Sequence, residues 1–366
     1  MKFSCYQNDL VEGINTVQKA VSSKTNLDIL KGILMETKDD KIVLTGNDLN
    51  LAISIAIDAQ ILEEGAAVLD SRLLGDIVRK LPDATIDFTM EQRQMDIQCL
   101  HSRFKLMSFD PEEFPQLPLI ENPQEIDLNK EVLKNMIKQT IFSVSTDETR
   151  PILTGSLLEI NEERLTMVAI DGYRLAMKSI ASTVKKSSKT VIPGKTLGEL
   201  LKILSGGSGE SVTVQITDKY IAFNIEEIQV VSKILEGEFI KYEQIIPSDF
   251  KTQLVVNTTA LLMAIERASL MTRESKSGTV KIAFDSEYLE VSSVSDIGSV
   301  SDRVRVKTEG DVFEIGFNPR YLTEALRVID SEEVIIKMSS SLSPCIIKPA
   351  DNDQYTYLVL PVRMSS

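Results

Sequence analysis

Residues 29–48 read ILKGILMETKDDKIVLTGND, and residues 152–171 read ILTGSLLEINEERLTMVAID. Both stretches alternate apolar and polar residues, break at a polar turn, resume the alternation and end near an aspartate. This pattern predicts two antiparallel strands joined by a short turn. A weaker third copy, GTVKIAFDSEYLEVSSVSD, begins at Gly278. The sequence therefore predicts one structural unit repeated three times, and this repeat decides the fold.

The segments that flank each copy repeat as well. A helical pattern precedes each copy, at residues 8–24, 129–142 and 257–276, and a second one comes after it, at residues 70–80, 194–204 and 318–329. Asn129 and Asn257 are predicted N-caps of their helices. Each repeat then closes with paired strands, at residues 85–109, 211–237 and 334–363. We predict an α+β fold of three repeated domains, each with two helices packed on antiparallel sheets of roughly eight short strands in total.

Proline and polar residues interrupt the periodic pattern at residues 114–125 and 245–250. Such interruptions are typical of domain boundaries. We therefore predict an N-terminal domain at 1–120, a central domain at 121–248 and a C-terminal domain at 249–366. A repeat of this length has the size of an ordinary domain and is too long for a solenoid repeat.

The composition favours a cytoplasmic protein with real hydrophobic cores, since 43% of the 366 residues are hydrophobic. The N-terminal stretch MKFSCYQNDL lacks the apolar core of a signal peptide, and the longest apolar runs, such as 52–57, are too short to cross a membrane. Cys5, Cys99 and Cys345 are odd in number and show no paired spacing. They fit a reducing compartment and argue against a disulfide framework or a zinc site.

Enzymatic activity has little support in the sequence. The chain has a single histidine, His101, which argues against a serine–histidine triad and against most zinc sites. We interpret His101 as a surface or interface residue of a strand-like run. A metal-dependent nuclease is the enzymatic alternative, but the carboxylates sit mainly in predicted turns. The glycine-rich stretch at 205–211 lacks the Lys-Ser/Thr of a phosphate-binding loop and comes after a helix. We expect no catalytic residues, no metal and no cofactor.

The charge of the chain is divided between its predicted elements. The net charge of −14 alone argues against nonspecific nucleic-acid binding, yet each of the six predicted helices is neutral or net positive. Lys130, Lys134 and Lys138 are spaced four residues apart and predict a basic stripe along one helix. For this helix alone, a solvated face is the simpler interpretation. Basic residues recur at equivalent places in all three repeats, however, which favours a surface that faces phosphates without reading bases; they are Arg72, Lys195 and Arg320.

Several motifs in a fixed order resemble one known family. The threefold repeat, the MKF start, RPILTG at 150–155, IDGYRLA at 170–176, LEGEF at 235–239 and YLVLPVRM at 357–364 together resemble the bacterial β sliding clamps. These are the non-catalytic processivity subunits of replicative DNA polymerase, and the resemblance covers the whole chain. It implies a ring-shaped, head-to-tail homodimer with six domains around double-stranded DNA, bound without regard to sequence. It also implies partners that bind through a short linear motif: the polymerase catalytic subunit, the clamp loader, and other polymerases and repair proteins. The alternative is a monomeric peptide-binding scaffold that does not encircle DNA.

The stretch AIDGYRLAM at 169–177 predicts a hairpin whose turn uses Gly172. The equivalent turn of the first repeat, in TGNDLNLAI at 45–53, is expected to be one residue shorter and lacks Gly-Tyr-Arg. The resemblance implies that the second hairpin forms a wall of the partner pocket, with Tyr173 and Arg174 at the rim and the C-terminal strand freed by Pro361. The implied pocket residues are Leu153, Ile170, Gly172, Tyr173, Arg174, Leu175, Ile240, Gln244, Ile245, Asn318, Tyr321, Leu342, Leu358, Val359, Leu360, Pro361, Val362 and Met364.

The resemblance also implies a DNA-facing set and a dimer seam. The DNA-facing residues are Lys24, Arg72, Lys138, Lys195 and Arg273. At the seam, the strand from Phe104 to Leu106 of one subunit is expected to meet Leu270 and Met271 of the other. Some family members have His in place of Tyr173, and Pro and Arg in place of Ile240 and Gln244. We expect the cleft to be kept, and these departures bear on its preference among motif variants.

Overall fold

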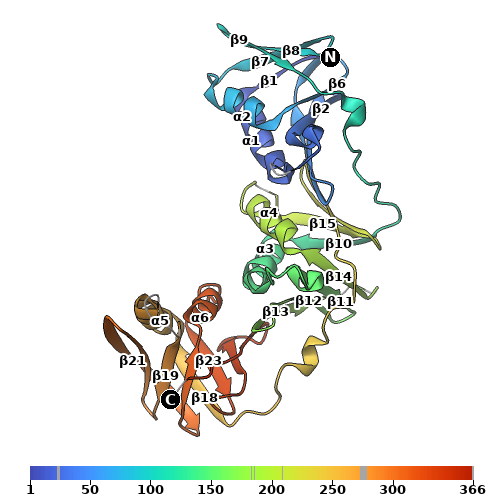
Figure 1. Cartoon of the computed structure of the whole chain (residues 1–366). Coiled ribbons are helices and arrows are strands. Elements are labelled where there is room, and N and C mark those ends of the chain that lie inside the picture. The colour runs from blue at the N-terminus through green and yellow to red at the C-terminus, as the bar shows by residue number, and fades with distance from the viewer. Residues whose placement is uncertain (23–24, 183, 185, 208, 273–277, 365–366) are drawn as a thin grey trace. The chain divides into compact units, whose positions relative to one another are not determined.

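The computed structural model describes residues 1–366 except 23–24, 183, 185, 208, 273–277 and 365–366 (Figure 1). The contacts within the chain divide it into two compact units. Unit 1 comprises residues 1–133 and 199–234, and unit 2 comprises residues 134–198 and 235–366. The middle third of the chain contributes to both units.

Unit 1 contains two antiparallel sheets, with strand orders β5-β1-β7-β8-β9 and β10-β15-β16-β17-β4-β3-β2-β6. Its helices are α1 (Gln7–Val17) and α2 (Ser71–Lys80). Its strands are β1 (Lys2–Tyr6), β2 (Gly32–Lys38), β3 (Lys41–Asn47), β4 (Leu51–Asp58), β5 (Gln60–Glu63), β6 (Ala66–Asp70), β7 (Thr85–Glu91), β8 (Gln94–Cys99), β9 (Ser102–Met107), β10 (Gln124–Asn129), β15 (Ser211–Ile216), β16 (Tyr220–Ile225) and β17 (Ile228–Lys233).

Unit 2 is built on one long sheet, with strand order β14-β11-β12-β13-β25-β24-β23-β18-β21-β20-β19-β22. Its helices are α5 (Thr258–Thr272) and α6 (Pro319–Leu326), and the two units share α3 (Lys130–Thr140) and α4 (Gly194–Leu204). Its strands are β11 (Gly155–Ile160), β12 (Arg164–Ile170), β13 (Arg174–Ala181), β14 (Ser188–Pro193), β18 (Thr252–Asn257), β19 (Val280–Phe284), β20 (Tyr288–Ser295), β21 (Gly298–Gly310), β22 (Glu314–Phe317), β23 (Glu333–Met338), β24 (Cys345–Pro349) and β25 (Tyr355–Val359).

The same kind of strand pairing joins each repeat to the next. In unit 1, β17 pairs antiparallel with β4, and Val231 lies opposite Ala52. In unit 2, β25 pairs antiparallel with β13, and Leu358 lies opposite Leu175. Consecutive repeats therefore continue one another's sheets through backbone hydrogen bonds.

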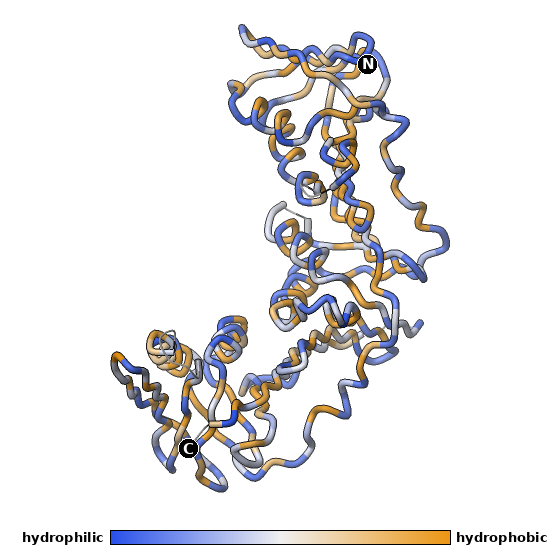
Figure 2. Tube along the Cα trace, viewed as in Figure 1, coloured by the Kyte–Doolittle hydropathy of each residue, from blue (hydrophilic) through white to orange (hydrophobic). Residues whose placement is uncertain are grey.

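The alternating pattern in the sequence builds the cores. Along the strands, hydrophobic and hydrophilic residues alternate in the tube of Figure 2, so one face of each sheet is apolar. In the C-terminal repeat, Leu261 and Ile265 of α5 and Leu322 of α6 pack with strand residues such as Leu254 in one buried cluster. Each such side chain contributes roughly 1.5–3 kcal/mol of burial free energy.

The predicted helix positions are confirmed, and the ends differ slightly. The side chain of Asn129 accepts hydrogen bonds from the backbone of Glu131 (3.0 Å) and Val132 (3.2 Å), so it caps α3 as predicted. Asn257 caps α5 through the backbone N–H of Ala260 at 2.9 Å. The helix predicted at 8–24 is shorter, since α1 ends at Val17 and a 3₁₀ turn comes next. In the part of the chain that the structure describes, the first repeat holds β1–β9, one strand more than expected.

The three cysteines and the histidine have ordinary environments. Cys5, Cys99 and Cys345 are buried free thiols, and burial raises the pKa of Cys5 to about 12, so this thiol is unreactive at neutral pH. His101 lies in the exposed turn between β8 and β9, as its interpretation as a surface residue requires. Among the described residues, no helix is long and apolar enough to cross a membrane.

Candidate partner-binding site and DNA-facing residues

Strand pairing brings the tip of the β12–β13 hairpin next to the C-terminal strand, although the two are far apart in the sequence. Arg174 lies opposite Val359 in the β13–β25 pair. Beyond the last paired residue, the backbone N–H of Leu360 donates to the carbonyl oxygen of Tyr173 at 2.8 Å. The juxtaposition on which the predicted pocket depends is therefore present within unit 2.

The hairpin turn is held by its aspartate. Oδ1 of Asp171 accepts hydrogen bonds from the backbone N–H groups of Tyr173 (2.9 Å) and Arg174 (3.0 Å). Between Asp171 and Tyr173, Gly172 has a φ of +96°, a left-handed conformation that glycine adopts without steric cost. This turn leaves the Tyr173 side chain 62% exposed at the tip.

The equivalent turn of the first repeat has the same length, so the prediction of a shorter turn was wrong. There, Oδ1 of Asp48 accepts from the backbone N–H groups of Asn50 (3.0 Å) and Leu51 (2.8 Å), and Leu49 takes the positive φ of 75°. A leucine in this conformation is uncommon, and no local pattern indicates it. The two hairpins differ at the first residue after the turn, where Leu51 in one corresponds to Arg174 in the other.

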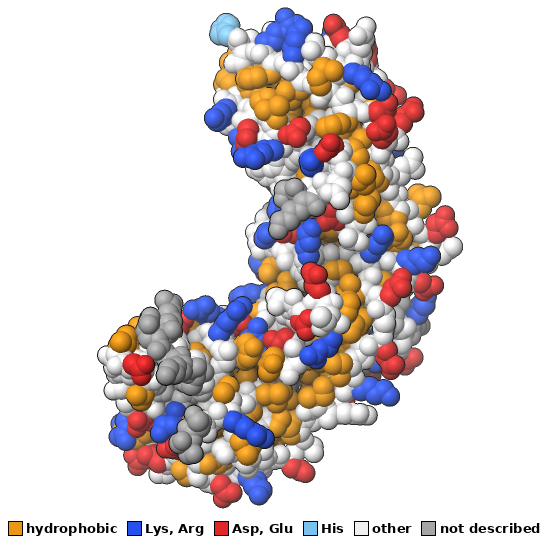
Figure 3. Space-filling view, viewed as in Figure 1, with side chains coloured by type: hydrophobic (Ala, Val, Ile, Leu, Met, Phe, Trp, Pro, Cys, Tyr) orange, Lys and Arg blue, Asp and Glu red, His pale blue; other side chains and the backbone are white. Residues whose placement is uncertain are grey.

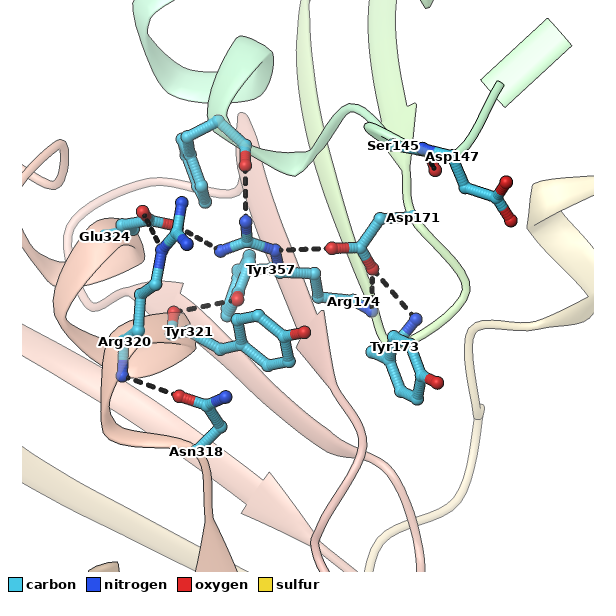
Figure 4. Close-up of polar contacts among 11 residues, drawn as sticks. Ser145, Asp147, Asp171, Tyr173, Arg174, Asn318, Arg320, Tyr321, Glu324 and Tyr357 are labelled. Atoms are coloured by element: carbon cyan, nitrogen blue, oxygen red, sulfur yellow. Dashed lines mark hydrogen bonds and ion pairs between the residues drawn. The ribbon is translucent and has the colours of Figure 1, made fainter. Parts of the chain in front are cut away.

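Arg174 is buried, so the prediction that it lies at the rim was wrong. Its guanidinium donates to Asp171 Oδ2 at 2.9 Å, to the carbonyl oxygen of Phe142 at 2.6 Å and to the carboxylate of Glu324 (Figure 4). It also lies over the ring of Tyr321, 4.4 Å from the centroid. Arg174 therefore joins the hairpin tip to the 3₁₀ turn after α3 and to α6. We call Arg174, Asp171, Phe142, Glu324 and Tyr321 the Arg174 cluster.

Glu324 links the Arg174 cluster to the start of α6. Glu324 also accepts from Arg320 at 2.8 Å, and the side chain of Asn318 caps the helix through the backbone N–H of Arg320 at 3.0 Å. Burial alone would raise the pKa of Glu324, but hydrogen bonds from Arg320 and Arg174 outweigh it and hold the pKa below its ordinary value. Asn318, a predicted pocket residue, therefore has a structural role as a helix cap.

The predicted pocket residues form two layers. Leu153, Ile170, Leu175 and Leu358 belong to one buried cluster, and Val359 is buried as well. Tyr321 and Pro361 are half-buried. Arg174 is buried and Asn318 is half-buried. The exposed members of the predicted set are Gly172, Tyr173, Ile240, Gln244, Ile245, Leu342, Leu360, Val362 and Met364. Buried members support the site from below, and only the exposed and half-buried ones are available to a partner.

The C-terminal segment does not hang free after Pro361, contrary to the prediction. The backbone N–H of Val362 donates to the carbonyl oxygen of Gly316 in β22 at 2.8 Å. Met364 packs over the same glycine, since a Cβ at Gly316 would lie 2.9 Å from its Cγ. The side chains of Val362 and Met364 remain partly exposed on this fixed segment, which reduces the ordering cost of binding.

The connector that carries Ile240 and Gln244 is held by a contact between Tyr242 and Glu159, two residues that the sequence analysis did not identify. The hydroxyl of Tyr242 donates to Glu159 Oε2 at 2.7 Å, and Lys189 forms an ion pair with the same carboxylate at 2.8 Å. Burial, together with the hydrogen bond to Glu159, raises the pKa of Tyr242, so the hydroxyl stays protonated. A tyrosine between polar neighbours is the only indication of this anchor in the sequence.

The predicted DNA-facing residues are only partly described. Arg72 on α2 and Lys195 on α4 are exposed, and Lys138 on α3 is half-buried. Lys24 and Arg273 lie outside the described residues. Figure 3 shows that lysine and arginine side chains (blue) are interspersed with acidic and hydrophobic ones on the visible face.

Lys130 does not belong to the predicted basic stripe. Its side chain is buried, and Nζ donates to the carbonyl oxygens of Gly206 and Gly207, the latter at 2.9 Å. It thus binds the carbonyl groups just beyond α4, where a positive charge is favourable. The stripe is reduced to Lys134 and Lys138 because this contact, distant in the sequence, takes up the third lysine.

Some of the predicted seam residues are exposed and others are buried. Phe104 is exposed on β9, the last strand of its sheet, whereas Leu106 is buried against its own sheet. At the end of α5, Leu270 is 55% exposed. Ile297, which the sequence did not single out, is 73% exposed at the tip of the β20–β21 hairpin. A Cβ at Gly298 would lie 3.7 Å from the sulfur of Met271, so this tip adjoins the end of α5.

Comparisons with known proteins agree over the whole chain. Residues 1–118, 127–241 and 243–363 match models of the N-terminal, central and C-terminal domains of the DNA polymerase III beta subunit. The chain is 36% identical to the beta sliding clamp of Staphylococcus epidermidis over 99% of both chains, and 36% identical to that of Bacillus subtilis over 99% of this chain and 100% of the relative. The crystal structure of the DNA polymerase sliding clamp from Bacillus subtilis matches with a TM-score of 0.96 over 100% of both chains. The predicted three-domain fold is confirmed.

Replacing Arg174 tests the role of the Arg174 cluster. Arg174→Met keeps the length of the side chain but leaves Asp171 and Glu324 without their buried partner, so we expect a loss of roughly 3–5 kcal/mol of stability. Arg320→Met is the matched control, because Arg320 is an exposed partner of the same Glu324 and its loss should cost at most about 1 kcal/mol. Scanning calorimetry measures both.

The contribution of Glu324 to the free energy of unfolding changes with pH in a defined direction. Since the folded-state pKa of Glu324 is lowered, its contribution is present above the ordinary pKa of glutamate and is lost as the pH falls through the lowered value. The gap between the wild-type protein and Arg174→Met should therefore narrow at acid pH. Equal melting temperatures of Arg174→Met and Arg320→Met at neutral pH would contradict the structural role of Arg174.

Proposed function

The chain belongs to the DNA polymerase III beta subunit family and is a non-catalytic DNA sliding clamp, and we propose that two copies close head to tail around duplex DNA. In this proposal the ring tethers the replicative polymerase, the clamp loader and other polymerases and repair proteins through the surface around Tyr173. It acts on DNA in the cytoplasm.

The threefold repeat of a two-helix domain carries the proposal for DNA. Each repeat places an exposed arginine or lysine at the start of its second helix: Arg72 on α2, Lys195 on α4 and Arg320 on α6. These charges are spaced and few, and the chain as a whole carries −14. Such a surface attracts phosphates weakly and without sequence preference, which suits a protein that moves along DNA.

The fixed arrangement around Tyr173 supports the proposal for partners. Exposed apolar side chains from three segments are each tied to the same sheet: the hairpin tip, the connector held by Tyr242, and the C-terminal segment held at Gly316. A short peptide that binds there meets apolar walls with a few polar groups, the composition of peptide-binding sites. Methionine at 364 can adapt to different partner side chains.

Edge strands support the proposal for the ring. β9 ends its sheet in unit 1, and residues 298–304 of β21 pair with β20 on one side only. Pairing of one edge with the other edge in a second copy would cover Phe104, Leu270 and Ile297 together. Such a seam satisfies backbone groups that are otherwise open to unwanted pairing.

Topological retention on DNA is the first test of the proposal. We expect the protein, once loaded, to stay on a nicked circular plasmid through gel filtration and to be lost when the plasmid is linearised. Direct affinity for a short linear duplex should be weak and fall steeply with salt. Equal retention on the circle and on the cut plasmid with free ends would show that the protein does not encircle DNA.

Charge at the seam should separate the two copies. In Leu270→Asp/Met271→Asp, pairing would bury unpaired charge at a cost of several kcal/mol per seam, so we expect a monomer at sub-micromolar concentration. Met263→Asp is the control, because Met263 is exposed on the same helix but away from its end and should leave the dimer intact. Sedimentation equilibrium gives the masses. If the double variant is still a dimer, the seam does not include Leu270 and Met271.

Loss of the exposed aromatic ring should weaken partner binding. We expect Tyr173→Ala to reduce the affinity for a fluorescein-labelled Gln/Leu/Phe-type peptide at least about tenfold, the usual loss for a central aromatic contact. Asn50→Ala changes the equivalent turn position of the first repeat and serves as the control with unchanged affinity. Fluorescence anisotropy measures both. Identical affinities of the two variants would place the partner site away from the hairpin tip.

A further inference from the structure

The first junction between repeats reproduces the frame on which the proposed partner site is built. In unit 1 the backbone N–H of Lys233 donates to the carbonyl oxygen of Asn50 at 2.9 Å, as Leu360 does to Tyr173 in unit 2. The aspartate-held turn is the same, and Leu49, which takes the positive φ, is 45% exposed at its tip. A hairpin tip thus lies beside the end of a paired strand at both junctions.

A connector borders the first junction as well. The side chain of Asn47 donates to the carbonyl oxygen of Pro115 at 3.2 Å and accepts from the backbone N–H of Leu49 at 2.8 Å. This ties the segment after β9 to the hairpin, much as Tyr242 ties the later connector in unit 2. The three parts that surround the proposed partner site therefore have counterparts within unit 1.

These three parts enclose a cavity of about 340 Å³. Its wall is largely apolar and includes Leu49, Leu51, Pro115, Pro118 and Val231, with the ring of Tyr220 beside them. Cavities that bind small ligands range from about 300 to 1,000 Å³ and have this mixture of apolar walls and a few polar groups. The volume suits one or two apolar side chains.

One charged group sets the chemistry of this cavity. Of the described residues that line it, Lys233 alone carries a charge, and the other polar ones include the amides Asn47, Asn50 and Gln116. None of the described residues that line the cavity has a carboxylate side chain. Leu51 occupies the position that corresponds to Arg174 at the second junction, where Arg174 has acidic partners. An incoming carboxylate would gain a charge-assisted hydrogen bond from Lys233 without meeting a like charge in the wall.

We propose that this cavity is a second peptide-binding site, and that it takes an extended segment of another protein in which a carboxylate side chain neighbours an apolar one. The apolar side chain enters between Leu49 and Pro118, and the carboxylate meets Lys233. The parallel between the junctions rests on the partner site proposed above. The cavity and its charge do not depend on that site, because they are features of unit 1 alone.

The test uses the full-length protein and a fluorescein-labelled peptide, Ala-Leu-Asp-Leu-Ala, with fluorescence anisotropy as the readout. Lys233→Glu should weaken binding at least tenfold. Lys219→Glu is the matched control, because it reverses the charge of an exposed lysine whose side chain does not line the cavity. Lys219 lies nearby, since its carbonyl oxygen accepts a hydrogen bond from the backbone N–H of Ile234. This variant should change the affinity less than threefold. The neutral peptide Ala-Leu-Asn-Leu-Ala carries the same label, and both peptides have an amidated C-terminus, so that only the side-chain carboxylate differs. Ala-Leu-Asn-Leu-Ala should bind the wild-type protein at least tenfold more weakly than Ala-Leu-Asp-Leu-Ala.

A second arm separates this proposal from the first site. Tyr173→Ala should leave binding of Ala-Leu-Asp-Leu-Ala unchanged, and Lys233→Glu should leave binding of the Gln/Leu/Phe-type peptide unchanged. If the acidic peptide loses affinity with Tyr173→Ala and not with Lys233→Glu, it occupies the first site and the proposal is wrong. Equal losses with Lys233→Glu and Lys219→Glu, or no saturable binding at millimolar peptide, overturn it too. If the proposed partner site around Tyr173 were wrong, the expected loss of acidic-peptide binding in Lys233→Glu would be unchanged.

Discussion

Antiparallel pairing between the last strand of one repeat and the central hairpin of the repeat before it is the constraint on which both junctions depend. In the β13–β25 pair, Leu175 and Leu358 face the same buried cluster from opposite strands. Because side chains alternate between the faces of a strand, a slip of one residue would exchange Leu358, buried beside Leu175, with Val359, which is buried in the core cluster on the other face. The register therefore also fixes where Leu360, Pro361 and Val362 leave the sheet, which places the exposed C-terminal segment beside Tyr173.

The sequence predicted what local patterns determine. Alternation predicted the hairpins, and helical spacing with Asn129 and Asn257 predicted two helix starts to the residue. What it could not predict depends on contacts between distant segments. From its spacing, Lys130 is expected in a solvated stripe, but in the fold it binds the carbonyl groups of Gly206 and Gly207. Arg174 is expected to be an exposed turn residue, but in the fold it forms an ion pair with Glu324. In both cases a charged side chain, usually exposed, is buried because its partners are brought to it.

The two junctions show how one backbone frame takes different chemistry. The turns at Asp48 and Asp171 have the same hydrogen bonds, so the backbone does not distinguish them. The difference starts with one residue: Leu51 packs into the core, whereas Arg174 needs two carboxylates and a carbonyl group to be buried without a large penalty. The partners that meet this requirement come from the 3₁₀ turn after α3 and from α6, which lie beside the hairpin. The second junction thus has a buried polar network behind its hairpin tip, whereas Lys233 is the one charged residue among the described residues that line the cavity of the first.

The acidic character of the chain is compatible with work on DNA because binding and retention are separate problems. A protein that holds DNA by affinity needs many phosphate contacts, and each one adds to the barrier for moving to the next position. The net charge is −14, and each repeat has one exposed basic residue at the start of its second helix, so the proposed DNA-facing surface offers few such contacts. A closed ring needs none of them to remain on DNA, since its retention depends on the seam. In the proposed ring, a strong seam and weak DNA contacts would be two parts of one requirement, and the surplus of acidic residues elsewhere would limit contact with phosphates to the helices.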